Sequence, residues 1–259
     1  LLGLRGTFTA PQHLTVGTGP VFVNVADFNR DGMQDLVVAN QSSDDVSILL
    51  GNGDGTFQPQ QRFPVGQAPT KAALGDVNGD GIQDLVTANQ LGSDLSLLLG
   101  NGDGTFQPER RVLVDAGPLS VVMEDFNGDG LMDLAVAYGN PRQISILLGN
   151  GDGTFRPQTR IPSHFPSFAD LAGADFDGNA TADLVVTNIA GTNLVVLLGI
   201  GDGTFRPPQD VVVAGAPFAV AVADWNRDGF EDVAATTLNG FVSILLNNGD
   251  GTFRRQRQF

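Results

Sequence analysis

Short apolar runs, rich in β-branched side chains and separated by polar turns, recur along the whole chain. One set opens on an acidic residue and reads DLVVAN, DLVTAN, DLAVAY, DLVVTN and DVAATT. A second set stands just before a glycine-rich turn and reads DVSILL, DLSLLL, QISILL, NLVVLL and FVSILL. No segment has the 3.6-residue apolar spacing of an amphipathic helix. The pattern therefore predicts an all-β protein.

These runs return in the same order about every 49 residues. Each unit reads as a proline-led strand, a polar loop, a second strand, a short turn, a third strand, a glycine-rich hairpin and a fourth strand. Four antiparallel strands repeated radially predict a β-propeller blade, whereas solenoid repeats are usually shorter or helical. The prolines that open the units are Pro20, Pro69, Pro118, Pro166 and Pro217. We predict a single domain over residues 1–259, made of a half-blade at 1–16 and blades at 17–65, 66–114, 115–163, 164–213 and 214–259.

An oxygen-rich nonapeptide lies between the first two strands of each unit. The five copies are DFNRDGMQD, DVNGDGIQD, DFNGDGLMD, DFDGNATAD and DWNRDGFED, beginning at Asp27, Asp76, Asp125, Asp175 and Asp224. Side-chain oxygens stand at positions 1, 3, 5 and 9, and Gly32 at position 6 permits the turn that points the carbonyl of Met33 inward. Calcium takes six to eight oxygen ligands at loosely defined angles, which such a loop can supply. Carboxylates this close would repel one another without an ion.

Other readings of the loop fit less well. A solvated acidic turn leaves the carboxylate repulsion unrelieved, and magnesium demands stricter geometry than a flexible loop gives. No copy contains His or Cys, which argues against zinc, copper and iron. The helix-loop-helix calcium motif needs a Glu at position 12, where this chain has Val38, Thr87, Val136, Val186 and Ala235.

A glycine-rich signature, GDGTF, closes the third strand of each unit. Its glycines suit the positive φ angles of tight hairpins and bulges. The aspartates of this signature could be further metal ligands, but turn formation through bonds to backbone amides is the favoured interpretation; they are Asp54, Asp103, Asp152, Asp202 and Asp250. Phe57 and its equivalents are expected to be apolar anchors between layers.

The chain resembles the FG-GAP and VCBS-type repeats, whose relatives form the propeller of integrin α subunits. The resemblance rests on the nonapeptide, with its following Leu or Val, and on LLGNGDGTF, and it covers essentially the whole chain. It implies up to five Ca²⁺ ions and a seven-bladed ring. The ligands implied for the first three loops are Asp27, Asn29, Asp31, Met33 and Asp35; Asp76, Asn78, Asp80, Ile82 and Asp84; and Asp125, Asn127, Asp129, Leu131 and Asp133. Those implied for the last two are Asp175, Asp177, Asn179, Thr181 and Asp183; and Asp224, Asn226, Asp228, Phe230 and Asp232.

The fourth loop departs from the pattern. Ala180 replaces the glycine at position 6, and Asn179 replaces the aspartate at position 5. We expect calcium to bind this loop least tightly.

The formal net charge of −15 is mostly ligand charge. Three aspartates in each loop account for fifteen of the 29 acidic residues, and five bound calcium ions would leave −5. Nucleic acid binding is not expected, since there is no basic stripe to neutralise phosphates. The one arginine cluster, Arg254, Arg255 and Arg257, reads as a solvated strand end.

Because the chain has no cysteine, the redox state of its compartment cannot be read from the sequence. The calcium loops are the remaining indication of where the protein acts. Calcium loops of modest affinity fill most readily outside cells, which predicts an extracellular, secreted or cell-surface protein. The chain contains no apolar stretch of about 18 residues or more, so membrane insertion is not expected.

The first residues align with a later repeat, so the chain opens inside a unit. Residues 1–17 match 49–66, with Arg5 where the other copies have Asp. This predicts a piece of a longer exported protein. The opening half-blade would lack its two inner strands, and the last unit ends on its own two outer strands. The predicted shape is an open arc of five and a half blades, whose exposed edges favour association.

Catalysis is not expected. The two histidines, His13 and His164, suit surface or packing roles. The glutamates are Glu109, Glu124 and Glu231, of which the last two sit at loops and either support an ion or are simply solvated. No nucleophile elbow or phosphate loop occurs. Trp225, at loop position 2, is expected to be a core aromatic residue.

Three functions remain open. The leading one is a calcium-stabilised extracellular scaffold for protein or glycan recognition or adhesion, with no enzymatic activity. Its recognition face would be made of the turns that differ between blades: Gln41 to Asp45, Gln90 to Asp94, Gly139 to Gln143 and Ile189 to Asn193. The alternatives are a non-catalytic module of a larger secreted enzyme and a calcium-dependent lectin that holds sugar between blades.

Overall fold

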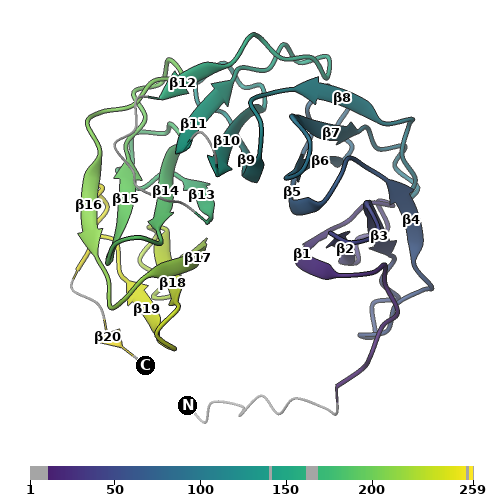
Figure 1. The fold of residues 1–259 in the computed structure, drawn as a ribbon, viewed down its shortest axis with the longest axis horizontal. Coiled ribbons are helices and arrows are strands. Elements are labelled where there is room, and N and C mark those ends of the chain that lie inside the picture. Colours follow the sequence, from purple (N-terminus) through teal and green to yellow (C-terminus); the bar gives the residue numbers. More distant parts are fainter. Residues whose placement is uncertain (1–10, 140–141, 162–168, 255–256, 259) are drawn as a thin grey trace.

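The computed structural model describes residues 11–139, 142–161, 169–254 and 257–258. Within these ranges every regular element is a strand, and no helix is long and apolar enough to cross a membrane. Twenty strands form five antiparallel sheets of four strands each. Figure 1 shows the five sheets arranged radially as an open arc, with a gap between the first and last sheets. The predicted all-β propeller architecture is confirmed.

Sheet order follows chain order from the axis outward in every blade. The innermost strands are β1 (Pro20–Ala26), β5 (Pro69–Gly75), β9 (Pro118–Glu124), β13 (Leu171–Ala174) and β17 (Pro217–Ala223). The second strands are β2 (Asp35–Asn40), β6 (Asp84–Asn89), β10 (Asp133–Gly139), β14 (Asp183–Asn188) and β18 (Asp232–Thr237). The third are β3 (Asp45–Leu49), β7 (Asp94–Leu98), β11 (Arg142–Leu147), β15 (Asn193–Leu197) and β19 (Val242–Leu245). The outermost are β4 (Gln61–Pro64), β8 (Arg110–Leu113), β12 (Thr159–Ile161), β16 (Gln209–Val212) and β20 (Arg257–Gln258).

Burial explains the two kinds of apolar run. In the three middle blades, the second strands are buried along nearly their whole length, because neighbouring blades cover both faces of the sheet. Such strands read as continuous apolar runs rather than as alternating ones. The outermost strands β4 and β16 alternate between exposed and half-buried residues. Because adjacent blades pack face to face, the core consists of four clusters, one between each pair of adjacent blades.

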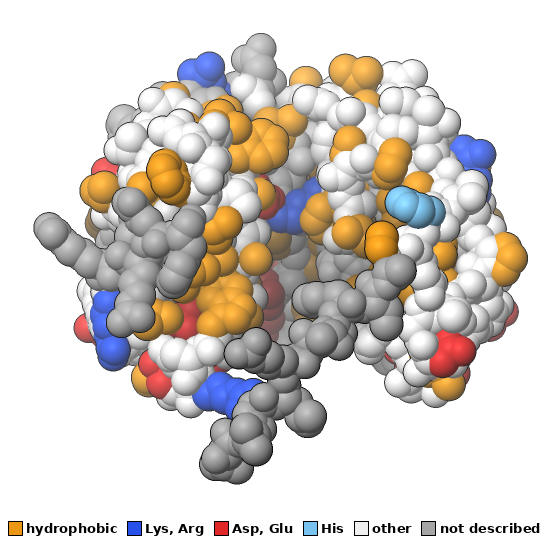
Figure 2. Space-filling model, turned by 90° about the horizontal axis from the view of Figure 1, so that it is seen from below, with side chains coloured by type: hydrophobic (Ala, Val, Ile, Leu, Met, Phe, Trp, Pro, Cys, Tyr) orange, Lys and Arg blue, Asp and Glu red, His pale blue; other side chains and the backbone are white. Residues whose placement is uncertain are grey.

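The two flanks of the arc expose apolar side chains that the inner blades bury. Val23 in β1 is 57% exposed, whereas its counterpart Val121 in β9 is fully buried. On the other flank Val242 is 40% exposed, whereas its counterpart Leu95 is fully buried. Figure 2 looks into the hollow between these flanks and shows hydrophobic side chains along both sides. Among the described residues, no further blade covers either flank.

The predicted half-blade at 1–16 is not supported by the structure. Residues 1–10 lie outside the described part of the chain, and residues 11–16 form no strand. The described residues form five blades rather than five and a half. Two further predictions, Pro166 as a blade opener and a packing role for His164, fall on residues that are not described.

Candidate metal centres

The nonapeptide joins the first and second strands of each blade, as predicted. Its first aspartate is fixed by the amides of its own loop. In the second copy, Asp76 accepts hydrogen bonds from the backbone N–H groups of Gly79 at 2.8 Å and Gly81 at 2.6 Å. In all five loops the N–H of position 6 donates to this carboxylate. The position 1 side chain is thus oriented before any ligand arrives.

Two positions of the loop adopt the left-handed backbone conformation. At position 6 the glycines have φ angles between 74° and 91°, and Ala180 of the fourth loop has φ 63°. The predicted need for glycine there is confirmed, and Ala180 adopts the same conformation at a steric cost. Position 4 is left-handed as well, even where it is Arg30 or Arg227. Glycine at this position in the other three loops is the signal in the sequence that could have predicted it.

Positions 3 and 5 form a polar pair in four loops. Asn29 donates its side-chain Nδ2 to Asp31 Oδ2 at 2.8 Å, and its Oδ1 accepts from the Asp31 backbone N–H at 3.1 Å. The same side-chain bond recurs in the second, third and fifth loops. The aspartates of these pairs are exposed and the asparagines are half-buried or exposed, so a cation can reach their oxygens from solvent.

Position 9 is the buried end of the loop. Its aspartate is fully buried in every blade: Asp35, Asp84, Asp133, Asp183 and Asp232. In the second blade, Asp84 accepts from the N–H of Val77 at 3.0 Å and from that of Gly100 at 2.8 Å. The second bond ties the loop to the start of the GDGTF hairpin, and the equivalent bond is present in all five blades. Sequence analysis missed this role, because the donor lies about 16 residues further along the chain.

The hairpin residue that donates this bond is glycine in four blades for a steric reason. A Cβ on Gly100 would lie 2.4 Å from the carbonyl oxygen of Gln83. The fifth blade carries Asn247 there, and its buried amide donates to the carbonyls of Phe176 and Glu231.

Burial without a cation is unfavourable for these carboxylates. Desolvation, reinforced by repulsion from the aspartates at positions 1 and 5 (positions 1 and 3 in the fourth loop), raises the pKa of Asp84, Asp133 and Asp183 to about 6. Their backbone hydrogen bonds oppose the shift only in part. The electrostatic environment of position 9 therefore favours the arrival of positive charge.

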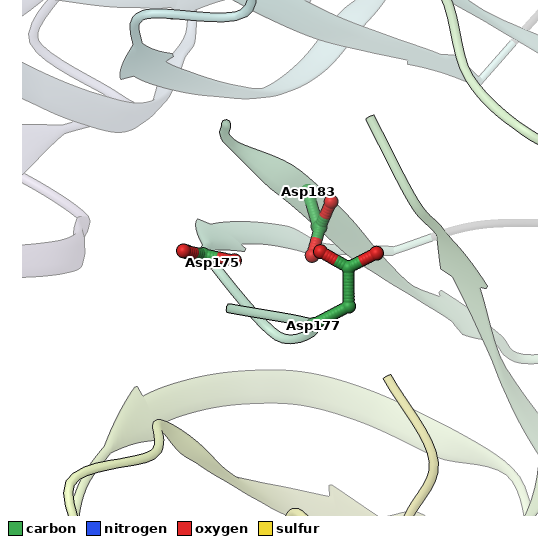
Figure 3. A group of neighbouring side chains, drawn as sticks. All are labelled: Asp175, Asp177 and Asp183. Carbon is green, nitrogen blue, oxygen red and sulfur yellow. The ribbon is translucent and has the colours of Figure 1, made fainter. Parts of the chain in front are cut away.

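Three carboxylates converge in the fourth loop. Side-chain oxygens of Asp175, Asp177 and Asp183 all lie within 4.8 Å of one another, and Figure 3 shows them around the loop. Asp177 stands at position 3, so the Asn and Asp of positions 3 and 5 are exchanged relative to the other loops. The guanidinium of Arg206 contacts Asp177 at 3.1 Å, and Asn179 donates its Nδ2 to the carbonyl of Gly199 at 3.2 Å. The Arg206 contact competes with a metal ion for the Asp177 carboxylate.

The first four loops also pack against the hairpin of the following blade. The Gly104 N–H donates to the carbonyl of Phe28 at loop position 2, at 3.1 Å, and three more blade junctions repeat this bond. The ring of Phe28 meets that of Phe106 edge-on, with centroids 5.8 Å apart. The loops therefore lie at the junctions between blades, where their rigidity affects the whole arc.

Trp225 was expected in the core, and that prediction is wrong. Its counterparts Phe28, Phe126 and Phe176 are at most 2% exposed, whereas Trp225 is 45% exposed. In the other blades this position is covered by the phenylalanine of the next hairpin. Within the described part of the chain, the last blade has no following hairpin to cover this position.

The hairpin aspartates form turns, as predicted. Each accepts from the backbone N–H and the hydroxyl of the threonine two residues later; for Asp103 and Thr105 these distances are 2.9 Å and 2.5 Å. These bonds lower the pKa of all five carboxyls. Oδ1 of each aspartate is engaged in the turn, which supports the turn-forming interpretation.

The remaining predicted residues are scattered. His13 is exposed, and Arg254 donates to Asn248 at 2.8 Å. Arg255 and the side chain of Arg257 lie outside the described part. Glu124 and Glu231 line a shallow pocket beside loop position 1 of the fourth blade, and burial raises the pKa of Glu124.

The donor set of the loops fits a hard cation. Each loop brings three carboxylates, one amide oxygen and several carbonyls together without nitrogen or sulfur ligands, which suits calcium. A family model for the FG-GAP-like repeat matches four overlapping segments, at residues 27–87, 76–136, 125–186 and 175–235. The chain belongs to the FG-GAP-like repeat family. No curated protein matches the sequence.

Solved structures share the fold of this FG-GAP-like chain at low sequence identity. A lectin from Agrocybe aegerita, described as recognising non-reducing terminal N-acetylglucosamine, is 24% identical with a TM-score of 0.63 over 93% of this chain and 66% of its own. A functionally unknown protein from Desulfotomaculum acetoxidans is 16% identical with a TM-score of 0.66, over 95% and 71%. BBS1N, solved in complex with ARL6DN, is 14% identical with a TM-score of 0.61, over 94% and 69%. The chain thus spans about two thirds of the structures that it matches.

Proposed function

We propose that this FG-GAP-like chain is a calcium-stabilised extracellular scaffold for recognition of a protein or glycan, without enzymatic activity of its own. The observation that carries the proposal is the buried position 9 aspartate. It is held by two backbone donors at the end of a loop that gathers two further carboxylates. Extracellular calcium is abundant enough to fill loops of modest affinity.

The side chains at positions 1, 3, 5 and 9 would hold the ion, as the family resemblance implies. Bound calcium would supply the positive charge that these clustered carboxylates lack. Because each of the first four loops is bonded to the hairpin of the next blade, an ion there would also stiffen the junction between two blades. The fourth loop would bind least tightly, since Arg206 and the strained Ala180 oppose it.

The recognition face would lie opposite the calcium loops. In antiparallel blades the turns between second and third strands emerge at the other end of the sheet from the loops between first and second strands. These turns differ from blade to blade, while the loops barely change. Variation on a constant frame supports a binding role. Residues 140–141 of the third turn lie outside the described part.

A calcium-dependent lectin is the second candidate. It is favoured by the fold shared with the Agrocybe aegerita lectin, although likeness at 24% identity concerns the fold alone. The seven-bladed ring remains part of the proposal. Its support is the pair of exposed apolar flanks, which further blades or another copy would cover. Association through these flanks belongs to the same proposal.

A thermal melt in excess calcium, excess magnesium and excess EGTA tests the proposal. Binding to the folded loops alone adds about 4 kcal/mol per site at a free concentration of about 1,000 times Kd. We expect calcium to raise Tm strongly and magnesium to raise it less. Equal melting temperatures in calcium and EGTA would refute the calcium part of the proposal.

A further inference from the structure

A pocket at the axis of the arc is distinct from the calcium loops. It has a volume of about 420 Å³, and side chains from all five blades line it. Its walls are largely apolar and include Phe22, Leu119 and Phe218, the last of which is 52% exposed. Its rim includes Gln41 and Gln90 from the variable turns. A concave, mostly apolar site with a few convergent polar groups is the usual form of a ligand site.

Backbone bulges direct the wall residues toward this pocket. In four blades the pairing of the first and second strands shifts by one residue just after the opening proline. The residues left unpaired there are Val21, Thr70, Leu119 and Phe218, and all four line the pocket. Bulges often re-aim a side chain next to a functional site. The repeat thus places a residue that differs between these four blades at the axis.

The floor of the pocket is an ion pair across the axis. Lys71, the only lysine of the chain, lies 2.5 Å from Asp170, which joins the second blade to the fourth. The ammonium also donates to the carbonyl of Leu171 at 2.7 Å and stands 5.9 Å from the centroid of Phe22. Asp170 further accepts from Ser120 Oγ at 3.0 Å and from the N–H of Val220 at 3.1 Å.

The floor and rim keep both donor and acceptor capacity. An ammonium has three N–H groups, and among the described residues two of those of Lys71 have partners. Gln41 Nε2 donates to Gln90 Oε1 at 3.0 Å, which leaves the Gln90 amide N–H₂ and the Gln41 oxygen without a partner in the described chain. The pocket is charge-balanced, because Lys71 and Asp170 neutralise each other.

This chemistry discriminates between ligand classes. A purely apolar side chain would remove water from the ion pair without replacing its hydrogen bonds, which is costly. An anion would meet the Asp170 carboxylate, and a cation would meet the Lys71 ammonium. A neutral hydroxylated ring avoids all three problems, because each hydroxyl both donates and accepts and the apolar ring face can pack on Phe218.

We propose that this axial pocket binds a neutral saccharide residue. The proposal rests on the recognition function above and deepens it by assigning the ligand class and the site. Phe218 packs on the ring, the amides of Gln41 and Gln90 contact hydroxyls at the rim, and the pair of Lys71 and Asp170 contacts hydroxyls at the floor. The site lies on the axis rather than between two adjacent blades.

Saturation-transfer NMR and titration calorimetry with neutral methyl glycosides test the proposal. The panel contains the α- and β-methyl glycosides of glucose, galactose, mannose and N-acetylglucosamine, with calcium present. Phe218→Ala and Gln90→Ala remove pocket contacts from exposed or half-buried positions. Phe241→Ala is the matched control, since Phe241 is 43% exposed but does not line the pocket. Calcium binding by each variant is measured in the same samples.

We expect at least one glycoside to bind, with affinity reduced about tenfold or more by either pocket variant and unchanged by the control. Loss of a stacking or hydrogen-bonding partner has an effect of that order. Binding that is insensitive to both pocket variants would overturn the proposal. So would the absence of binding by every glycoside while calcium still binds, an outcome that leaves the calcium scaffold standing. Failure of calcium binding alone would contradict the scaffold and not the pocket.

Discussion

The closing aspartate of each loop, at position 9, combines a predicted ligand role with burial and a hydrogen bond to the hairpin of its own blade. Spacing alone predicted position 9 as a ligand, because carboxylates at 1, 5 and 9 form a recognisable donor set. Its burial and its bond to the hairpin of the same blade could not be predicted, since both depend on how two distant turns meet. The exposed turn aspartates were predicted correctly, because their partner is only two residues away.

Asp84→Asn separates these roles. The amide cannot accept from both Val77 and Gly100 without turning its own N–H₂ toward one donor. In EGTA we expect the free energy of unfolding to fall by about 2 kcal/mol, the cost of an unsatisfied buried group. In calcium the loss should be larger, because a ligand is also removed. Urea denaturation under both conditions measures the two effects.

Asp103→Asn is the matched control, since it is exposed and its oxygen can still accept from Thr105. An Asp84→Asn protein as stable as this control in both conditions would show that the buried carboxylate has no structural or metal-binding role.

At the scale of strands, the apolar runs located most elements to within a residue or two. The strand beginning at Asp35 or Asp84 follows from a β-branched run after an acidic residue. The bulges after the opening prolines were not predicted, because one unpaired residue changes the side-chain pattern of a strand too little to be recognised in the sequence. The axial pocket, which depends on them, was therefore invisible in the sequence.

Tyr138 in β10 reports on the packing of the third blade. It is fully buried and donates to Gln158 Oε1 at 3.0 Å, and burial raises its pKa to about 12. The neutral phenol thus contributes stability that is fully present below about pH 10, the unfolded value, and is lost as pH rises toward 12. As the only tyrosine, it can be titrated by the ultraviolet absorbance of phenolate. We expect a midpoint near 12 in the native protein and near 10 in urea.

Tyr138→Phe is the control for that titration and should remove the absorbance change and the associated loss of stability between pH 10 and 12. A native midpoint near 10 would mean that the tyrosine is solvated and that the third blade is packed differently.

At the scale of the whole molecule, the repeat period predicted radial blades, because units that cannot bury their apolar faces alone must stack. The half-blade was inferred from alignment alone, and residues 11–16 make no strand. The prediction for Trp225 was wrong because it too was based on likeness to other repeats. Burial at that position comes from the next blade, which local sequence cannot reveal.

Fluorescence of Trp225, the only tryptophan, tests the open flank. At 45% exposure it should be quenched readily by acrylamide in the folded monomer, with little further gain on unfolding. Association that covers this flank should shift its emission to the blue and reduce quenching as protein concentration rises. Protected, blue-shifted emission from a protein that sedimentation shows to be monomeric would contradict the exposed flank.

Anomalous diffraction from crystals grown in calcium tests the central claim most directly. We predict a calcium peak at each nonapeptide, about 2.3–2.6 Å from the oxygens of positions 1, 3, 5 and 9, with the weakest peak in the fourth loop. Loops that show no anomalous peak in calcium-grown crystals would contradict the claim that calcium joins the blades.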